Sequence, residues 1–279
     1  MSPRRLLAGA LAFITVFCMA VADAAQGQPK EVVRVRGSGD MAERVSSCAK
    51  EFMKSHPGAN IVVSGGPRID WNGLASGDTD VVMASHKISD QEREALQRQG
   101  VIPDEVLTGY GGIVVVVSPS NPVNEMTADQ VRKVLTGTYE NWDQVGGKSQ
   151  RIAVITVDET RSGFPESVRQ EFLKGPLHRN AEKRSNFHSV ISAVCWESNA
   201  IGFVRLDDLQ RLKPEEPEAK VKVVSVKADE RSPAVKPAAD TVDNGSYPLK
   251  VPHYVYLNRK NTKPVVREFV DFCAAGLKR

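Results

Sequence analysis

One short segment of this chain combines residue types that are suited to binding an anion. Arg161, Ser162 and Gly163 follow the stretch 151–157, which is β-branched and typical of a buried strand. The next stretch, 164–172, places Phe164, Val168 and Phe172 at four-residue intervals, as on one face of a helix. The pattern therefore predicts a strand, a tight loop and a helix in immediate succession.

A loop of this kind has a chemical use. Ser162 or Gly163 can cap the helix, and Pro165 suits the first helical turn because its missing N–H needs no partner there. Backbone N–H groups and the positive end of the helix dipole then point toward one place, and Arg161 adds a forked guanidinium that matches oxyanions. The alternative is an ordinary strand-to-helix turn with a solvent-facing Arg161.

Small hydroxyl and glycine residues also follow three earlier predicted strands. They are Ser38 and Gly39 after 31–36, Ser64 and Gly65 after 59–63, and Ser85 after 80–84. Alternating strands and helices predict a parallel sheet covered on both faces, and ligands bind beyond the carboxyl ends of such strands. We therefore expect these three turns to converge on one edge of the sheet.

The remaining elements follow from periodicity and turn residues. Helices are expected at 41–52, 89–98, 127–135, 187–193 and 264–277, and strands at 111–117, 199–204, 219–226 and 251–257. The stretch 229–245 is rich in Pro and Asp and is expected to be a loop.

The beginning of the chain has the pattern of an export signal. Arg4 and Arg5 precede an apolar run from Leu6 to Ala22, and an Ala-x-Ala cleavage pattern ends at Ala24. Residues 1–24 are therefore expected to be a cleaved signal peptide, and the remaining protein to be exported and soluble. A net charge of +3 gives no reason to expect nucleic acid as a partner.

Other motifs argue against catalysis and metal binding. The five histidines lack metal-ligand spacing, and neither a G-x-S-x-G elbow nor a C-x-x-C motif occurs. We expect no enzyme activity, no metal and no cofactor. Cys48 and Cys273 fall on the first and last helices and can pair if these pack together, although buried free thiols explain them equally well.

Several longer stretches resemble one known family. They are Gly111–Trp142 with its S-P-S-N-P turn and T-G-T-Y-E-N-W end, Ser64–His86, Ala200–Val204 (A-I-G-F-V) and Tyr247–Leu257. In this order they are similar to the periplasmic phosphate-binding protein of the phosphate ABC transporter, in the type II periplasmic binding protein superfamily. The chain resembles a divergent member of it.

The resemblance implies an α/β fold of two lobes with mixed, mostly parallel sheets, a hinge and an interlobe cleft. Lobe 1 then spans 31–109 plus 248–279, and lobe 2 spans 111–247. The implied function is capture of phosphate or a related small oxyanion for an inner-membrane ABC permease, by a periplasmic monomer. The alternative is a binding-protein fold whose degenerate anion site serves sensing or accessory interaction.

The implied ligand-binding residues match the family only in part. They are Ser38, Gly39, Ser64, Gly65, Ser85, Arg161, Ser162 and Gly163. The usual arginine position of the anion loop is Asp158 here, a threonine position is Phe164, and Asp40 replaces a neutral donor. Because a carboxylate facing an anion is repulsive, these departures put the identity of the ligand in question.

Overall fold

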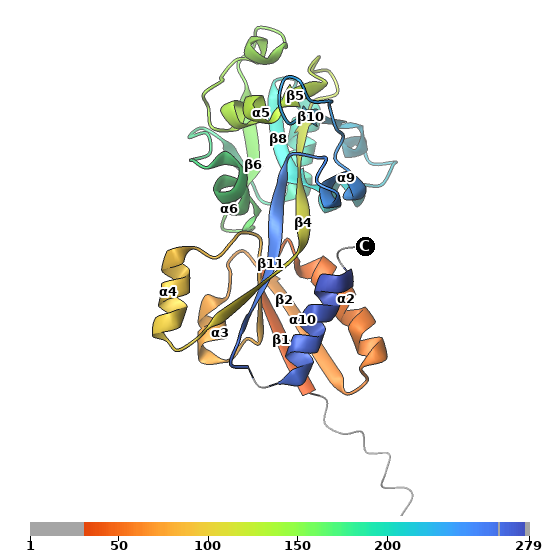
Figure 1. Ribbon diagram of the computed structural model, residues 1–279. Helices are drawn as coiled ribbons and strands as arrows, with labels where there is room; N and C mark the ends of the chain where they lie inside the picture. The colour runs from red at the N-terminus through yellow and green to blue at the C-terminus, as the bar shows by residue number, and fades with distance from the viewer. Residues whose placement is uncertain (1–30, 262, 277–279) are drawn as a thin grey trace, which may run out of the picture.

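The structure is a computed structural model that describes residues 31–261 and 263–276. The predicted signal peptide, residues 1–24, lies outside them. The elements divide between two lobes joined by two long strands, β4 (Pro103–Val117) and β11 (Lys250–Asn258), which run through both (Figure 1). Across the described part of the chain the strands are ordered β2-β1-β3-β11-β4-β8-β6-β7, with β9 also paired to β4.

The first lobe is a twisted sheet with helices on both faces (Figure 1). It contains β1 (Glu31–Ser38), α2 (Ala42–Ser55), β2 (Ala59–Gly66), α3 (Trp71–Ser76), β3 (Val81–Ala84), α4 (Asp90–Arg98) and α10 (Pro264–Gly276). Successive side chains of a strand point to opposite faces. Val81 and Met83 accordingly join the core under α2 and α10, whereas Val82 and Ala84 join the core under α3 and α4.

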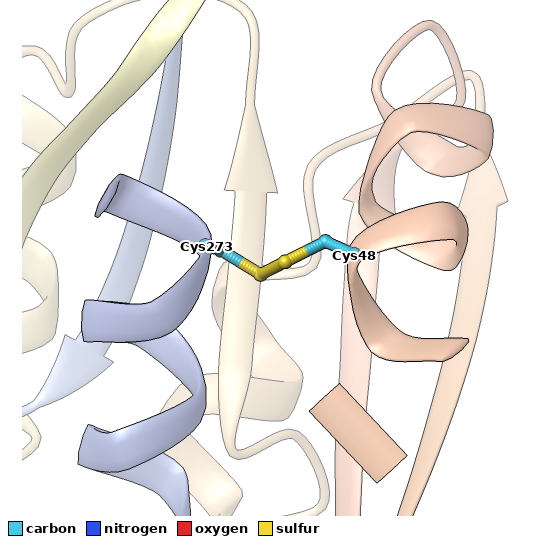
Figure 2. Close-up of a disulfide and its surroundings, with 2 residues drawn as sticks. All are labelled: Cys48 and Cys273. Atoms are coloured by element: carbon cyan, nitrogen blue, oxygen red, sulfur yellow. A yellow bond between two sulfur atoms is a disulfide. The ribbon is translucent and has the colours of Figure 1, made fainter. Parts of the chain in front are cut away.

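A disulfide joins the two helices on one face of this lobe. Cys48 of α2 is bonded to Cys273 of α10, 225 positions later (Figure 2). Of the two possibilities that the sequence leaves open, the structure has the bonded one. Cys195 is a buried free thiol. Two segments from opposite ends of the described chain are thus linked covalently.

The second lobe has its own hydrophobic core around the middle of the chain. Its strands are β5 (Glu125–Thr127), β6 (Ala153–Val157), β7 (Glu182–Arg184), β8 (Ala200–Arg205), β9 (Lys222–Val223) and β10 (Ser225–Lys227). Its helices are α5 (Ala128–Leu135), α6 (Phe164–Val168), α7 (Phe187–Trp196), α8 (Leu206–Gln210) and α9 (Ala239–Asp243). Short helical turns occupy Trp142–Val145, Arg169–Leu173 and Pro217–Lys220. The apolar run Ile113–Val117 of β4 lies fully buried at the centre, as expected of a strand covered on both faces.

Three expectations about local structure were wrong. The stretch 219–226 is not one strand, because β9 pairs with β4 and β10 with β5, so the chain changes sheets at Val224. The expected loop 229–245 contains α9, which buries Val242 against the second core. The strand expected at Gly111 begins eight residues earlier, at Pro103, since its first half pairs with β11.

The two connecting strands meet closely where they pass between the lobes. Gly109 has φ +149°, and a Cβ on Gly111 would lie 2.6 Å from Nε2 of His253. Glycine at these two positions lets the backbone of β4 turn and lets the imidazole of β11 approach it. The pairing register also shifts between His253 and Tyr254. This region, the crossover, is the place at which the lobes can move relative to one another.

Candidate functional site

Three buried serine hydroxyls meet between the two lobes. Ser38 and Ser85 belong to the first lobe and Ser167 to the second. The Oγ of Ser85 lies 3.2 Å from that of Ser38 and 2.6 Å from that of Ser167. The exposed fractions are 4%, 0% and 2%. These residues, the hydroxyl row, form a set of adjustable donors and acceptors shielded from water.

The sheet and α6 bring the hydroxyl row together. β1 and β3 are parallel neighbours, so Ser38 at the end of β1 and Ser85 just after β3 lie at the same edge. The N–H of Ser85 donates to Ser38 Oγ at 3.3 Å. Ser167 lies one turn into α6, where its hydroxyl is 3.2 Å from the carbonyl oxygen of Gly163. The strands therefore position two hydroxyls and the helix presents the third.

A small cavity opens beside the crossover. Its volume is about 20 Å³. It is lined by Asp40, Gly111, Gly112, Phe164, Arg205, Leu206, Asp207 and His253, from both lobes and both connecting strands. A volume of this size holds about one water molecule. A tetrahedral oxyanion can enter this interlobe cavity only when the lobes separate.

Asp40 is the most unusual side chain of the interlobe cavity. It is 8% exposed, and neither carboxyl oxygen has a hydrogen-bond partner among the described residues. Burial raises the pKa of this carboxyl, while nearby Ser85 and the charge of Arg205 oppose the rise. Removal from water disfavours the charged form, so the environment favours the protonated acid.

Two basic side chains complete the interlobe cavity. Arg205 donates two hydrogen bonds of 2.7 Å to Asp208 and lies over the ring of Phe187 at 4.7 Å. Burial lowers the pKa of Arg205, but the hydrogen bonds and charge of Asp208, together with other nearby carboxyl groups, outweigh this and leave it raised. His253 is 6% exposed, and burial lowers its pKa to about 3, so its imidazole is neutral. The fixed positive charge of the cavity thus comes from Arg205.

The residues predicted from the sequence do not all gather here. Ser38 and Ser85 join the hydroxyl row, whereas Ser64 lies within β2, opposite Arg36, with its side chain exposed. Gly39 donates its N–H to the carbonyl of Gly66 at 2.8 Å, and a Cβ on Gly65 would lie 2.7 Å from Gly39 Cα. The glycine turn therefore packs tightly against its neighbour.

In the loop before α6, several backbone N–H groups donate to acceptors within the loop itself. The N–H groups of Arg161 and Ser162 donate to the carbonyl of Asp158 at 2.9 and 3.1 Å, and that of Phe164 lies 3.3 Å from Ser162 Oγ. Gly163 rather than Ser162 is the N-cap residue, and the side chain of Arg161 is exposed. The carboxylate of Asp158 accepts hydrogen bonds from the N–H and the hydroxyl of Thr160 at 2.7 and 2.6 Å.

At Gly163 the backbone of the second lobe comes close to the backbone of the first lobe. A Cβ there would lie 2.9 Å from the carbonyl oxygen of Pro67, in the first lobe. A larger residue would push the two lobes apart at this point. Gly163 therefore lies at the lobe boundary.

Sequence reasoning missed three residues of the site. Ser167 is four positions after Gly163, so helical spacing places it on the face that meets the loop. Arg205 ends β8 as Ser38 ends β1, and the rule about strand ends applies to it equally. His253 carries no local signal, because only the pairing of β11 with β4 brings it to the interlobe cavity.

The described residues contain neither a cluster suited to a metal ion nor a membrane-spanning helix. No group of three or more His, Cys, Asp or Glu side chains within residues 31–261 and 263–276 is arranged to hold a metal ion. None of the helices in these ranges has both the length and the apolar character needed to cross a membrane.

Comparison with known proteins decides the family. The sequence pattern of the PBP superfamily domain matches residues 24–276, nearly all of the chain. The chain belongs to the PBP superfamily. Within this superfamily, it is 26% identical to the phosphate-binding protein PstS of Staphylococcus saprophyticus, an alignment that covers 91% of this chain and 78% of that protein.

Solved structures have the same two-lobe arrangement as this PBP superfamily member. A putative phosphate ABC transporter substrate-binding protein with bound phosphate, from Clostridium perfringens, aligns with a TM-score of 0.64, 22% identity and coverage of 87% and 92% of the two chains. An ABC-type phosphate transport receptor from Vibrio cholerae aligns with a TM-score of 0.69, 22% identity and coverage of 88% and 96%. The type II periplasmic binding protein fold predicted from the sequence is therefore confirmed.

Proposed function

We propose that this protein captures phosphate, or a closely related tetrahedral oxyanion, between its lobes and delivers it to an inner-membrane ABC permease. The observation that carries the proposal is the hydroxyl row, in which Ser85 meets Ser38 from its own lobe and Ser167 from the other. Relatives that bear the name phosphate-binding protein PstS support the choice of ligand.

The chemistry of capture uses hydrogen bonds and no covalent step. When the lobes separate, the contact between Ser85 and Ser167 is broken. The hydroxyls of Ser38, Ser85 and Ser167 can then donate to the oxygens of an entering anion. Hydrogen bonds to a charged acceptor are about twice as strong as those between neutral groups. Exchanging O–H···O contacts for charge-assisted bonds therefore drives the lobes to close on the ligand.

The predicted anion loop contributes at the edge of this site. Gly163 lies at the lobe boundary, and the hydroxyl oxygen of Ser162 accepts a hydrogen bond from the N–H of Phe164. Arg161, exposed beside them, attracts an anion from solution by its charge. Gly39 packs tightly against Gly65 of the neighbouring strand, next to Ser38. Ser64 stays a candidate ligand contact at the outer edge of the sheet.

The setting of this function is also part of the proposal. We infer an exported, periplasmic protein whose residues 1–24 are removed, acting as a monomer without enzyme activity. The proposed lobes are 31–109 with 248–279, and 111–247. The runner-up function, a degenerate anion site used for sensing or accessory interaction, is less favoured because three buried hydroxyls still meet between the lobes.

Isothermal titration with phosphate and arsenate tests the proposal. The purified wild-type protein and the Ser85→Ala variant are titrated side by side. We expect phosphate binding in the wild type and a loss of about tenfold or more in affinity in the variant, because a hydroxyl that bonds a charged ligand is removed. Ser76→Ala is the control, because Ser76 is an exposed residue of α3 whose hydroxyl bonds Asp78. Absence of binding by a folded wild-type protein would remove the transport assignment.

A further inference from the structure

The interlobe cavity is lined by a buried carboxyl group, that of Asp40, whose oxygens accept no hydrogen bond from the described residues. Asp40 follows β1 by two residues, is more than nine-tenths buried, and has no hydrogen-bond partner for either oxygen among the described residues. Ser85, which lies next to it, already shares its hydroxyl between Ser38 and Ser167. The carboxyl therefore faces the interlobe cavity with its bonding capacity unused.

The charged groups around Asp40 do not neutralise it. Those near it are Arg205 at the end of β8, Asp207 of α8, His86 after β3 and His253 of β11, and Arg44 of α2 is close to the imidazole. Two of the five N–H donors of Arg205 are directed to the carboxylate of Asp208, and no hydrogen bond joins Arg205 to Asp40 among the described residues. His253 is buried and neutral. An ionised Asp40 would be a buried anion without a paired cation, which is costly.

We propose that Asp40 determines the ligand specificity of the closed site: it is buried there as the uncharged acid and donates its O–H to the bound oxyanion. This inference rests on the proposed function. A protonated carboxyl has one donor, and Asp40 lies beside Ser85 of the hydroxyl row. As the uncharged acid, Asp40 serves as a neutral hydrogen-bond donor. The repulsion between a carboxylate and the bound anion is then absent.

Two consequences follow from an acid that donates. First, the ligand needs no proton of its own, so the site accepts fully ionised tetrahedral anions such as sulfate as well as phosphate. Secondly, closing on such a ligand takes one proton from solvent onto a carboxyl oxygen of Asp40. Since burial raises the pKa of Asp40, the proton is bound more tightly in the closed form than in the open one.

The test is isothermal titration of wild type and Asp40→Asn with sulfate, which does not titrate in this range, at about pH 5, 6, 7 and 8. Each titration is repeated in two buffers of different ionisation enthalpy, which counts the protons taken up. We expect wild-type sulfate affinity to fall with rising pH, by at most about tenfold per pH unit, with net proton uptake. The asparagine amide donates without titrating, so the variant is expected to bind with a flat pH profile and no uptake.

Asp90→Asn is the matched control, because Asp90 is an exposed carboxyl of the same lobe outside the interlobe cavity. It is expected to titrate like the wild type. Phosphate binding without sulfate binding, at every pH, would overturn the proposal and leave the proposed function standing, since the ligand would then have to bring its own proton. A pH profile shared by wild type and Asp40→Asn would also overturn it.

Failure of both anions to bind would instead refute the proposed function, and with it this inference. Thermal unfolding without ligand tests the protonation of Asp40 independently of anion binding. A buried acid with a raised pKa loses its favourable contribution to stability as pH rises, so Asp40→Asn should gain in melting temperature relative to wild type from about pH 5 to pH 8. A constant difference would show that Asp40 is not buried as the acid.

Discussion

The hydroxyl oxygens of Ser85 and Ser167 lie 2.6 Å apart, although the residues are 82 positions apart in the chain and belong to different lobes. Ser85 lies at the carboxyl end of β3, and Ser167 lies on α6. Their contact exists only when the lobes are closed. Under the proposed function, this contact links closure of the lobes to anion binding at the hydroxyl row.

Ser167→Ala should weaken phosphate binding by about tenfold or more, because a hydrogen bond to a charged ligand is lost. Isothermal titration measures the change. Ser149→Ala is the control, since Ser149 is an exposed residue of the same lobe whose hydroxyl bonds Asp143 at 2.9 Å. Unchanged affinity in Ser167→Ala would mean that α6 supplies no ligand contact.

Arg161→Ala should slow phosphate association a few-fold at low ionic strength and have little effect at high salt. The reason is that Arg161 is exposed, and the attraction between exposed charges is screened by salt. Stopped-flow kinetics at two salt concentrations measure this. Arg179→Ala removes the same charge from another exposed position and should have the smaller effect. Complete loss of binding in Arg161→Ala would instead make Arg161 a direct ligand contact.

Reduction of the Cys48–Cys273 disulfide should lower the free energy of unfolding by about 2–5 kcal/mol, because the bond limits the freedom of the unfolded chain. Urea unfolding with and without a reductant measures the change. A Cys48→Ala, Cys273→Ala double variant should be insensitive to the reductant, and Cys195→Ala should respond like the wild type. Equal midpoints for oxidised and reduced protein would contradict the prediction.

Acid should destabilise the protein through His253. Its pKa is lowered from 6.5 to about 3, chiefly by burial, so the folded protein keeps the imidazole neutral while the unfolded chain protonates. The contribution is complete above pH 6.5 and is lost as pH falls toward 3, with a slope of at most about 1.4 kcal/mol per pH unit. Asp40 acts in the opposite direction.

Urea unfolding across this pH range, in wild type and His253→Gln, isolates the effect. The comparison uses the pH slopes, because the substitution also changes packing beside Gly111. The variant should show the shallower loss of stability in acid. Parallel slopes would mean that His253 is protonated in the folded protein.

Local sequence patterns predicted most of the elements because the interactions that form them are short-range. The capping boxes at Ser89 and Thr127 are present as helix starts, with hydrogen bonds to Glu92 and Gln130. The buried strand at 113–117 follows from its unbroken apolar run. The division of 219–226 between two sheets was not predictable in this way, because it depends on partners about a hundred residues earlier.

The candidate site was predictable only in part, for the same reason. The rule that ligands bind at strand ends identified Ser38 and Ser85, and the loop before α6 identified Gly163. Ser64 satisfied the same rule, yet it lies on the outer strand β2 with its side chain exposed. Position at a strand end does not specify which way the side chain faces or how far the strand lies from the crossover.

The sequence alone determined the class of fold, the order of the elements and the residue types at strand ends, since periodicity and capping act over a few residues. The tertiary structure decided which of those residues meet. Parallel pairing of β1 with β3 joins Ser38 to Ser85, lobe closure adds Ser167, and the antiparallel pairing of β4 with β11 brings His253 to the interlobe cavity with Asp40. Burial raises the pKa of that carboxyl and lowers the pKa of that imidazole. This burial comes from residues distant in the sequence, so chain neighbours alone do not predict either pKa.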